Sequence, residues 1–519
     1  MIEFYLNDQP ISSTEAPASA LLDFVRYHEH LMGTKIGCRE GDCGACTVLV
    51  GELTPNGQTI AYQSMTSCLT PLGNAHGKHI ITVEGINAAD GQLTPVQQAI
   101  VTEGGSQCGF CTVGFVMSLT GHCLSEKPAS EKSTIAAIDG NICRCTGYKS
   151  LERAAATLAA QLADRPTQDA VAWLSEQQFV PHYFQEMPAK LLVLRTRLAD
   201  SEAATASNTT EFQEQLGNIT AGNGSVADSP NGHGQSQNGH SNRQNSHNQS
   251  FAHPLLSGGT DLLVQRLDEL REQPVRLIFD QSGRRGIHQE TGGRVVLGAA
   301  TTASHLLDSA LMRGLLPQLS AYLKLVSSTP IRNMGTVAGN FINGSPIGDL
   351  TIMFLALGAS ITLADAAGAT RELALSNLYL SYKKLAKETD EQVTEISFPA
   401  PVSGDFFNFE KVSKRTHLDI ASVNTAAWLR VENGLVQSAR VSAGGVGPVP
   451  LLLTRTSDFL IGRELSTATM AAANEVMQTE ISPISDVRGT AEYKRLLLRQ
   501  LLWAHFLRFA PALELGELI

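Results

Sequence analysis

All nine cysteines lie within the first 145 residues, and eight of them form two groups of four whose spacings suit metal binding. The first group reads Cys38-x4-Cys43-x2-Cys46, with Cys68 further on, and the second reads Cys108-x2-Cys111, with Cys143-x-Cys145 further on. Four thiolates hold one [2Fe–2S] cluster, and C-x4-C-x2-C…C is the plant-type ferredoxin spacing. Two groups in one chain predict a protein that passes single electrons between two clusters.

Zinc is the alternative ligand for four cysteines. Zinc ribbons usually carry two C-x2–4-C knuckles, and the x4 and x2 spacings on one loop do not match them, so the first group favours a cluster. Gly37, Gly41 and Gly44 let that loop wrap with positive backbone torsions. The second group is less specific, because its first pair resembles one zinc knuckle. The ninth cysteine, Cys123, lies in an apolar run and is expected to be a core residue.

Two glycine-rich stretches could bind a nucleotide. Ser257-Gly258-Gly259-Thr260-Asp261 follows a predicted strand, and a second stretch runs from residue 331 to residue 349. Glycines there allow the backbone to approach a phosphate, although a plain tight turn is the alternative for the first stretch. No G-x-G-x-x-G follows a strand, so a Rossmann-type site is not indicated. No catalytic acid–base pair is assigned.

The elements that would position these motifs fall into several domains. Residues 2–6, 47–50, 59–63 and 80–83 read as strands of a small β-rich unit, and residues 115–124, 133–138 and 151–162 read as helices after Pro95. Residues 217–250 are rich in Asn, Ser, Gly and His and predict a flexible linker. Beyond it, strand and helix signals alternate to about residue 400, with a strand leaving the Gly258-Gly259 turn. Strands and a helix at residues 493–509 complete a multidomain α+β chain.

Composition narrows the class of protein. The chain has 519 residues, which predicts three or four domains. The formal net charge of −11 argues against a nucleic-acid partner. No signal peptide or apolar stretch of about 18 residues is visible, so we expect no membrane association and a cytoplasmic location.

Several of these motifs together resemble the molybdenum hydroxylase family. The similarity rests on residues 37–48 around the first cysteines, on residues 107–112 and 141–148 around the second group, on the two glycine-rich stretches, and on residues 489–495. It covers nearly all of the chain except about residues 165–250. The motif order is similar to that of the iron–sulfur/FAD subunit of xanthine dehydrogenases.

The resemblance implies a domain plan. It comprises a ferredoxin-like β-grasp [2Fe–2S] domain (1–82), a four-helix [2Fe–2S] domain (83–165), a linker with the low-complexity segment (166–250), a two-part FAD-binding domain of the vanillyl-alcohol-oxidase type (251–402) and a small α+β C-terminal domain (403–519). It also implies that FAD contacts Leu256, Ser257, Gly258, Gly259, Thr260, Asp261, Leu262, Thr336, Gly339, Asn340 and Asp349.

The resemblance further implies partners and a reaction. Gln107 resembles a glutamine that touches the molybdopterin cofactor of a large partner subunit, and such heterodimers pair into heterotetramers. Electrons from xanthine oxidation, a step of purine metabolism, would pass through both clusters to FAD and on to NAD+. Two departures are Val113, where the family usually has proline, and residues 417–421, where many members are more acidic.

Three alternatives stay open. The same role is possible in another molybdenum hydroxylase, with an aldehyde, nicotinate or aromatic acyl-CoA as substrate. A non-enzymatic iron–sulfur protein, acting as a redox sensor or scaffold, is an alternative of another class, and bound flavin would exclude it. A zinc-stapled structural protein is the last alternative, and the ratio of iron to zinc decides it.

Overall fold

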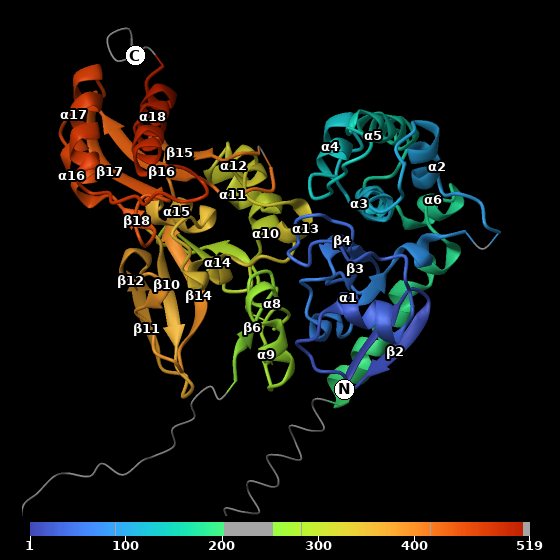
Figure 1. The fold of residues 1–519 in the computed structure, drawn as a ribbon. Coiled ribbons are helices and arrows are strands. Elements are labelled where there is room, and N and C mark those ends of the chain that lie inside the picture. The colour runs from blue at the N-terminus through green and yellow to red at the C-terminus, as the bar shows by residue number, and fades with distance from the viewer. Residues whose placement is uncertain (89, 202–252, 282, 416, 512–519) are drawn as a thin grey trace, which may run out of the picture.

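The structure, a computed structural model, describes residues 1–88, 90–201, 253–281, 283–415 and 417–511 (Figure 1). In the view of Figure 1 the N-terminal sheet lies below a group of helices, and the remaining domains lie beside them. No helix in the described part of the chain is long and apolar enough to cross a membrane.

The N-terminal domain is a mixed five-stranded sheet in the order β2-β1-β5-β3-β4, in which β1 and β5 are parallel. Alternate residues of β1, among them Phe4, enter a core shared with Leu21 and Leu22. Its elements are β1 (Ile2–Leu6), β2 (Gln9–Ser13), α1 (Leu21–Asp23), η1 (Phe24–His28), β3 (Thr47–Leu53), β4 (Ile60–Thr66), η2 (Leu72–Ala75), β5 (His79–Ile81) and η3 (Val83–Ile86).

The second domain is helical. Thr94 and Gln97 form a capping box that starts the first helix, as expected for a chain with Pro95 in the first turn. The second helix is buried along most of its length and carries Cys123, which is fully buried in the core as predicted. The helices are α2 (Pro95–Thr102), α3 (Thr112–Leu124), α4 (Glu131–Ala136) and α5 (Lys149–Gln161).

Residues 166–201 differ from the linker that we expected over residues 166–250. They form α6 (Val171–Glu176), η4 (His182–Gln185) and a further helix at residues 187–201. Met187, Leu191 and Leu194 recur at helical spacing and are buried in the same core as the second domain. This part of the expected linker is therefore packed against the iron–sulfur half, whereas residues 217–250 lie outside the described residues.

The third domain contains a five-stranded sheet in the order β11-β10-β14-β9-β8, with helices packed around a large apolar core. The expected strand after the Gly258-Gly259 turn is a short helix instead. Its elements are β6 (Leu255–Leu256), α8 (Leu262–Gln265), α9 (Leu267–Arg271), β7 (Arg276–Leu277), β8 (Ile287–Gln289), β9 (Arg294–Gly298), α10 (Ala303–Asp308), α11 (Ala310–Leu315), α12 (Leu319–Lys324), α13 (Thr329–Arg332), α14 (Val337–Asn343), α15 (Asp349–Ala356), β10 (Ser360–Ala364), β11 (Thr370–Ala374), η5 (Leu375–Asn377), β12 (Tyr379–Ser381), β13 (Lys384–Leu385) and β14 (Gln392–Pro399).

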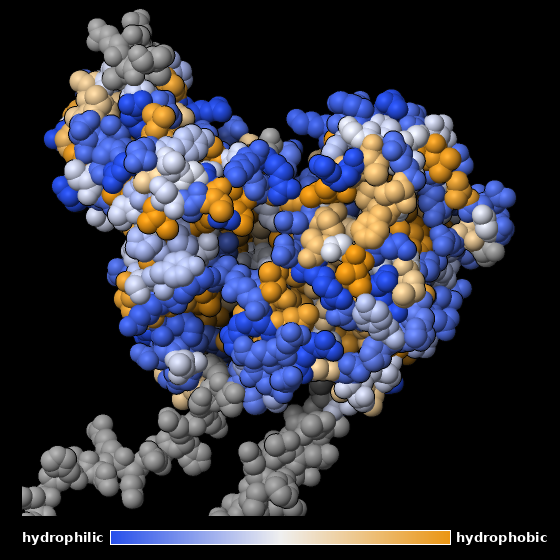
Figure 2. Space-filling model, in the orientation of Figure 1, coloured by the Kyte–Doolittle hydropathy of each residue, from blue (hydrophilic) through white to orange (hydrophobic). Residues whose placement is uncertain are grey.

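The C-terminal domain is a four-stranded antiparallel sheet covered by helices, with a core of its own. Its elements are β15 (Asp405–Val412), β16 (Val423–Glu432), β17 (Leu435–Gly444), β18 (Leu451–Leu452), α16 (Thr454–Leu460), α17 (Thr467–Gln478) and α18 (Ala491–Phe509). Figure 2 shows a mostly hydrophilic surface, with apolar residues gathered near the middle of the view, where the iron–sulfur half meets the third domain.

Candidate functional site

The first cysteine group surrounds one end of the β3–β4 pair. Cys46 directly precedes β3 and Cys68 follows β4, and the antiparallel register that pairs Thr47 with Thr66 brings these two cysteines together. Their sulfurs lie 3.3 Å apart and are not bonded, since a disulfide would need about 2.05 Å. Both side chains are buried.

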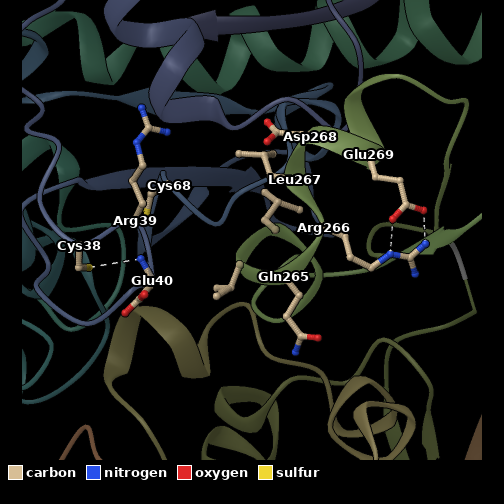
Figure 3. A pocket seen from close by; sticks show the side chains of 11 residues that line it. Cys38, Arg39, Glu40, Cys68, Gln265, Arg266, Leu267, Asp268 and Glu269 are labelled. Carbon is tan, nitrogen blue, oxygen red and sulfur yellow. Dashed lines mark hydrogen bonds and ion pairs between the residues drawn. The ribbon is translucent and has the colours of Figure 1, made fainter. Parts of the chain in front are cut away.

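The loop before β3 supplies the other pair. The Cys43 N–H lies 3.3 Å from the Cys38 sulfur, and the Cys38 N–H lies 3.4 Å from the Cys43 sulfur. The Glu40 N–H also donates to the Cys38 sulfur at 3.4 Å (Figure 3). The neighbouring Cys43 thiol stabilises the Cys38 thiolate and lowers the pKa of Cys38 to about 5. Backbone N–H groups aimed at sulfur suit thiolate ligands.

The second group also forms pairs. The Cys108 and Cys145 sulfurs lie 3.6 Å apart at the surface. Cys143 is buried and accepts hydrogen bonds from the N–H and hydroxyl of Thr146, at 3.3 and 3.1 Å. Burial is the main cause that raises the pKa of Cys111 to about 12, and a hydrogen bond with Cys143 adds to it. The predicted ligands of each group are thus brought together.

The pairing of the sulfurs matters for the kind of metal site. Within the described residues, no group of three or more His, Cys, Asp or Glu side chains is arranged to hold a metal ion. The closest sulfurs form pairs, Cys46 with Cys68 and Cys108 with Cys145, and a [2Fe–2S] cluster takes two thiolates on each of its two irons. The paired donor sets fit a two-iron cluster.

A hydrogen bond joins the two groups directly. The Ile142 N–H, next to Cys143, donates to the carbonyl of Cys43 at 3.0 Å. The Asn141 side chain donates to the Gly44 carbonyl at 3.2 Å. A Cβ at Gly114 would overlap this carbonyl, so the close approach of α3 requires glycine. Sequence reasoning missed these contacts, because they join residues about 100 positions apart.

The two glycine-rich stretches lie side by side. A Cβ at Gly258 would overlap the Met334 carbonyl, and Gly259, with φ +82°, lies against the Leu69 carbonyl of the N-terminal domain. Thr260 lies close to Gly335. The Ser257 hydroxyl is buried and has no hydrogen-bond partner in the described part of the chain. An unpaired buried hydroxyl next to glycine backbone fits a bound nucleotide.

Other predicted FAD residues already have partners within the protein. The Thr336 hydroxyl caps α14 by accepting from the Gly339 N–H, and Asn340 accepts from the N–H and hydroxyl of Thr351. Leu256 is fully buried in the core of the N-terminal domain, and Leu262 packs against that core. Asp261 accepts a hydrogen bond from Gln265. These residues shape the loops, whereas Ser257 is left available.

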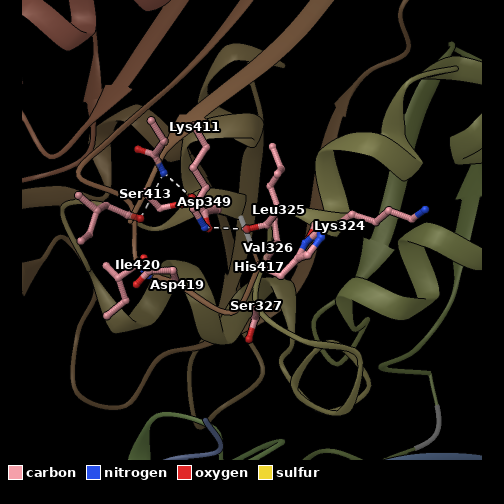
Figure 4. Close-up of polar contacts among 12 residues, drawn as sticks. Lys324, Leu325, Val326, Ser327, Asp349, Lys411, Ser413, His417, Asp419 and Ile420 are labelled. Carbon is pink, nitrogen blue, oxygen red and sulfur yellow. Dashed lines mark hydrogen bonds and ion pairs between the residues drawn. The ribbon is translucent and has the colours of Figure 1, made fainter. Parts of the chain in front are cut away.

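Asp349 forms a buried cluster that sequence reasoning did not find (Figure 4). Lys411 donates to one carboxylate oxygen at 2.7 Å and to the Leu325 carbonyl at 2.7 Å, and Asn424 donates to the other carboxylate oxygen at 2.6 Å. Burial raises the pKa of Asp349 despite the neighbouring Lys411. Lys411 and Asn424 come from β15 and β16, so the cluster ties the C-terminal domain to the second glycine-rich stretch.

A cavity of about 440 Å³ opens beside the first cysteine group (Figure 3). It is lined by Cys38 and Cys68 on one side and by α8 and α9 on the other. Arg39, also in its lining, is held by two hydrogen bonds to Asp23, at 3.1 and 2.7 Å. The first cysteine group therefore lies between the N-terminal sheet and the third domain.

Four protein families match successive parts of the chain. They are described as "2Fe-2S iron-sulfur cluster binding domain" (residues 4–73), "[2Fe-2S] binding domain" (82–156), "FAD binding domain in molybdopterin dehydrogenase" (244–401) and "CO dehydrogenase flavoprotein C-terminal domain" (409–509). The chain thus has the architecture of the iron–sulfur and FAD part of the molybdenum hydroxylases.

Similar whole proteins are longer. Xanthine dehydrogenase of Blastobotrys adeninivorans is 27% identical over 97% of this chain and 40% of its own length, and aldehyde oxidase 1 of Bos taurus is 25% identical over 99% and 40%. The chain therefore spans about two fifths of the curated relatives that it matches. Among solved structures, reconstituted CO dehydrogenase from Oligotropha carboxidovorans matches with a TM-score of 0.46 and 29% identity, over 48% of this chain and 86% of that chain.

Proposed function

We propose that this chain is the electron-transfer subunit of a xanthine dehydrogenase, which receives electrons from a molybdenum site in a partner chain and delivers them to NAD+. The observation that carries the proposal is the hydrogen bond from the Ile142 N–H to the Cys43 carbonyl, at 3.0 Å. It links two ligand groups in a chain whose third domain matches an FAD-binding family.

Each group of residues has a role in this proposal. Cys38, Cys43, Cys46 and Cys68 hold one [2Fe–2S] cluster, and Cys108, Cys111, Cys143 and Cys145 hold the other. When bound, the clusters would supply one-electron transfer, and FAD would supply the hydride transfer to NAD+. The Ser257 hydroxyl and the backbone of Gly258 and Gly259 bind and orient the flavin nucleotide, while Thr336, Asn340 and Asp349 hold the facing loop in place.

The two exposed cysteines of the second group support a docking role. Cys108 and Cys145 are at the surface, beside Gln107 and two exposed aromatic side chains, Phe110 (46% exposed) and Tyr148 (38% exposed). Exposed aromatic residues are enriched at protein interfaces. We place the molybdopterin-binding subunit on this surface, with Gln107 against its cofactor, in a heterodimer that pairs into a heterotetramer in the cytoplasm.

The first test is the visible spectrum of this chain co-expressed with its molybdenum partner, recorded without oxygen before and after xanthine is added. Bleaching of both flavin and iron–sulfur bands is the expected result. Bleaching by NADH but not by xanthine would keep the electron-transfer role and reject the substrate. A chain that binds neither iron nor flavin would reject the proposal altogether.

An aldehyde is the second candidate substrate. Aldehyde oxidases are among the relatives, at an identity close to that of the xanthine dehydrogenases. The same anaerobic experiment with an aromatic aldehyde in place of xanthine separates the two, because only the true substrate reduces the flavin.

A further inference from the structure

Residues 139–143 lie where the second cysteine group meets the first cysteine loop and the third domain. Electrons would have to pass between these parts. We infer that Asp139, at the start of this segment, is a positioning residue that fixes the second cysteine group against the first group and against the FAD loops. The inference rests on the proposed electron-transfer function, because it concerns the route between the groups.

Asp139 binds the third domain through both carboxylate oxygens. One oxygen accepts the N–H of Thr329 at 2.8 Å, and the other accepts the Thr329 hydroxyl at 3.1 Å and an Arg332 guanidinium N–H at 2.5 Å. The side chains of Asp139 and Arg332 are only 11% and 4% exposed. This is a buried ion pair between residues 193 positions apart, so it holds the helical domain to α13.

The residues after Asp139 pass this attachment on to the cysteines. Gly140 packs against Pro330, the next residue of α13. Asn141 donates to the Gly44 carbonyl, and Ile142 donates to the Cys43 carbonyl. Cys143 then supplies a buried sulfur to the second group. Four consecutive residues thus fix the direction from which Cys143 approaches Cys43.

The same short helix contacts the other two parts. Ile331 packs against Gly41 in the first cysteine loop. Met334, just past the helix, presents its carbonyl to Gly258, and Thr336 starts α14 two residues later. Through α13, one carboxylate therefore sets the relative position of both cysteine groups and the FAD loops.

A second ion pair between the same two domains provides a control. Lys127 and Asp308 lie 3.9 Å apart, and their side chains are 48% and 52% exposed. An exposed ion pair contributes little to stability, whereas removal of one member of a buried pair leaves the other charge buried without a partner. Arg332 also donates to the carbonyls of Val326 and Ser327, so it stays in place when Asp139 is changed.

The experiment compares wild type with Asp139→Asn, Asp139→Ala and the control Asp308→Asn, each as the full chain loaded with iron and FAD. Two readouts are measured: the magnetic coupling between the two reduced clusters by electron paramagnetic resonance, and the rate at which electrons redistribute to the flavin after one-electron photoreduction. The coupling depends on the distance and orientation of the clusters, so a loss of stability alone does not change it.

We expect Asp139→Ala to alter the magnetic coupling and to slow electron redistribution by roughly tenfold, because a small displacement of the reacting groups slows a reaction strongly. Asp139→Asn keeps an oxygen for the Thr329 N–H and should fall between Asp139→Ala and wild type, and it serves as the informative variant if Asp139→Ala does not fold. Asp308→Asn should match wild type. If the loaded Asp139→Asn variant has the coupling and the rate of wild type, the inference about Asp139 is wrong but the proposed function stands. If the wild-type chain binds no iron, the proposed function itself is wrong.

Discussion

The sulfur and the carbonyl of Cys43 serve different contacts. The sulfur faces Cys38, and the carbonyl accepts the Ile142 N–H. Replacement of the side chain therefore removes a proposed ligand but keeps the contact with the second group. The loss of a ligand can therefore be measured while the hydrogen bond between the two cysteine groups is kept.

We expect Cys43→Ala to lose about half of the bound iron, because one of two [2Fe–2S] sites is lost, and to block flavin reduction by the substrate. Iron content and the anaerobic spectrum measure these effects. Cys123→Ala is the matched control, since Cys123 is a buried core residue and should cost stability but no iron. Flavin reduction at the wild-type rate in Cys43→Ala would contradict a route through the first cluster.

The unpaired Ser257 hydroxyl leads to a second prediction. A buried hydroxyl without a partner destabilises the protein, and a bound ligand that accepts a hydrogen bond from it removes that cost. Ser257→Ala should weaken FAD binding by about 2- to 10-fold, since one hydrogen bond contributes about 0.5–1.5 kcal/mol, without lowering the stability of the flavin-free chain. Fluorescence titration with FAD and thermal unfolding of the apoprotein measure the two quantities. Unchanged affinity would place the nucleotide elsewhere.

At the scale of elements, the turn that connects β6 to α8 is fixed by a close approach between domains. Gly259 combines a φ of +82° with contact to the Leu69 carbonyl and Pro71 of the N-terminal domain. A side chain there meets both a strained backbone and a facing domain. We expect Gly259→Ala to destabilise the protein by about 1–3 kcal/mol and to weaken FAD binding.

Urea unfolding of the full chain tests this, with Gly292→Ala as the control, because Gly292 has open space around it. The control should unfold like wild type. Equal stability of Gly259→Ala and wild type would mean that the loop can move away from the N-terminal domain.

Local pattern was enough to predict the strands at residues 2–6 and the helix at residues 493–509, because hydrophobic periodicity, capping and turn residues act over short distances. It failed at the helix of residues 187–201, although Met187, Leu191 and Leu194 carry helical spacing, since a nearby polar tract suggested a linker. The cysteines could be singled out by type and spacing. The Asp139–Arg332 and Asp349–Lys411 contacts could not, because only the tertiary fold brings these residues together.

At the scale of the whole molecule, charged residues join the N-terminal domain to the third domain. Lys78 contacts Glu52 at 2.7 Å and Asp280 at 2.8 Å, and Arg285 binds the same two carboxylates. The Lys78 side chain is 6% exposed, whereas the carboxylates are about a third exposed. Burial by itself raises the pKa of Glu52, but Lys78 and Arg285 outweigh it and hold that pKa well below its usual value.

A depressed carboxyl pKa adds stability that is present above the unfolded pKa, about 4.3 for Glu, and is lost as the pH falls below it. Lys78→Met should therefore lower the free energy of unfolding at pH 7 by about 1–3 kcal/mol, less than for a fully buried pair because the carboxylates are partly exposed. The difference from wild type should shrink at pH 3.5. Urea unfolding at both values measures it, and Lys149→Met, which removes an exposed pair with Glu152, is the control. A difference that grows on acidification would show that Glu52 is not stabilised as a carboxylate by Lys78.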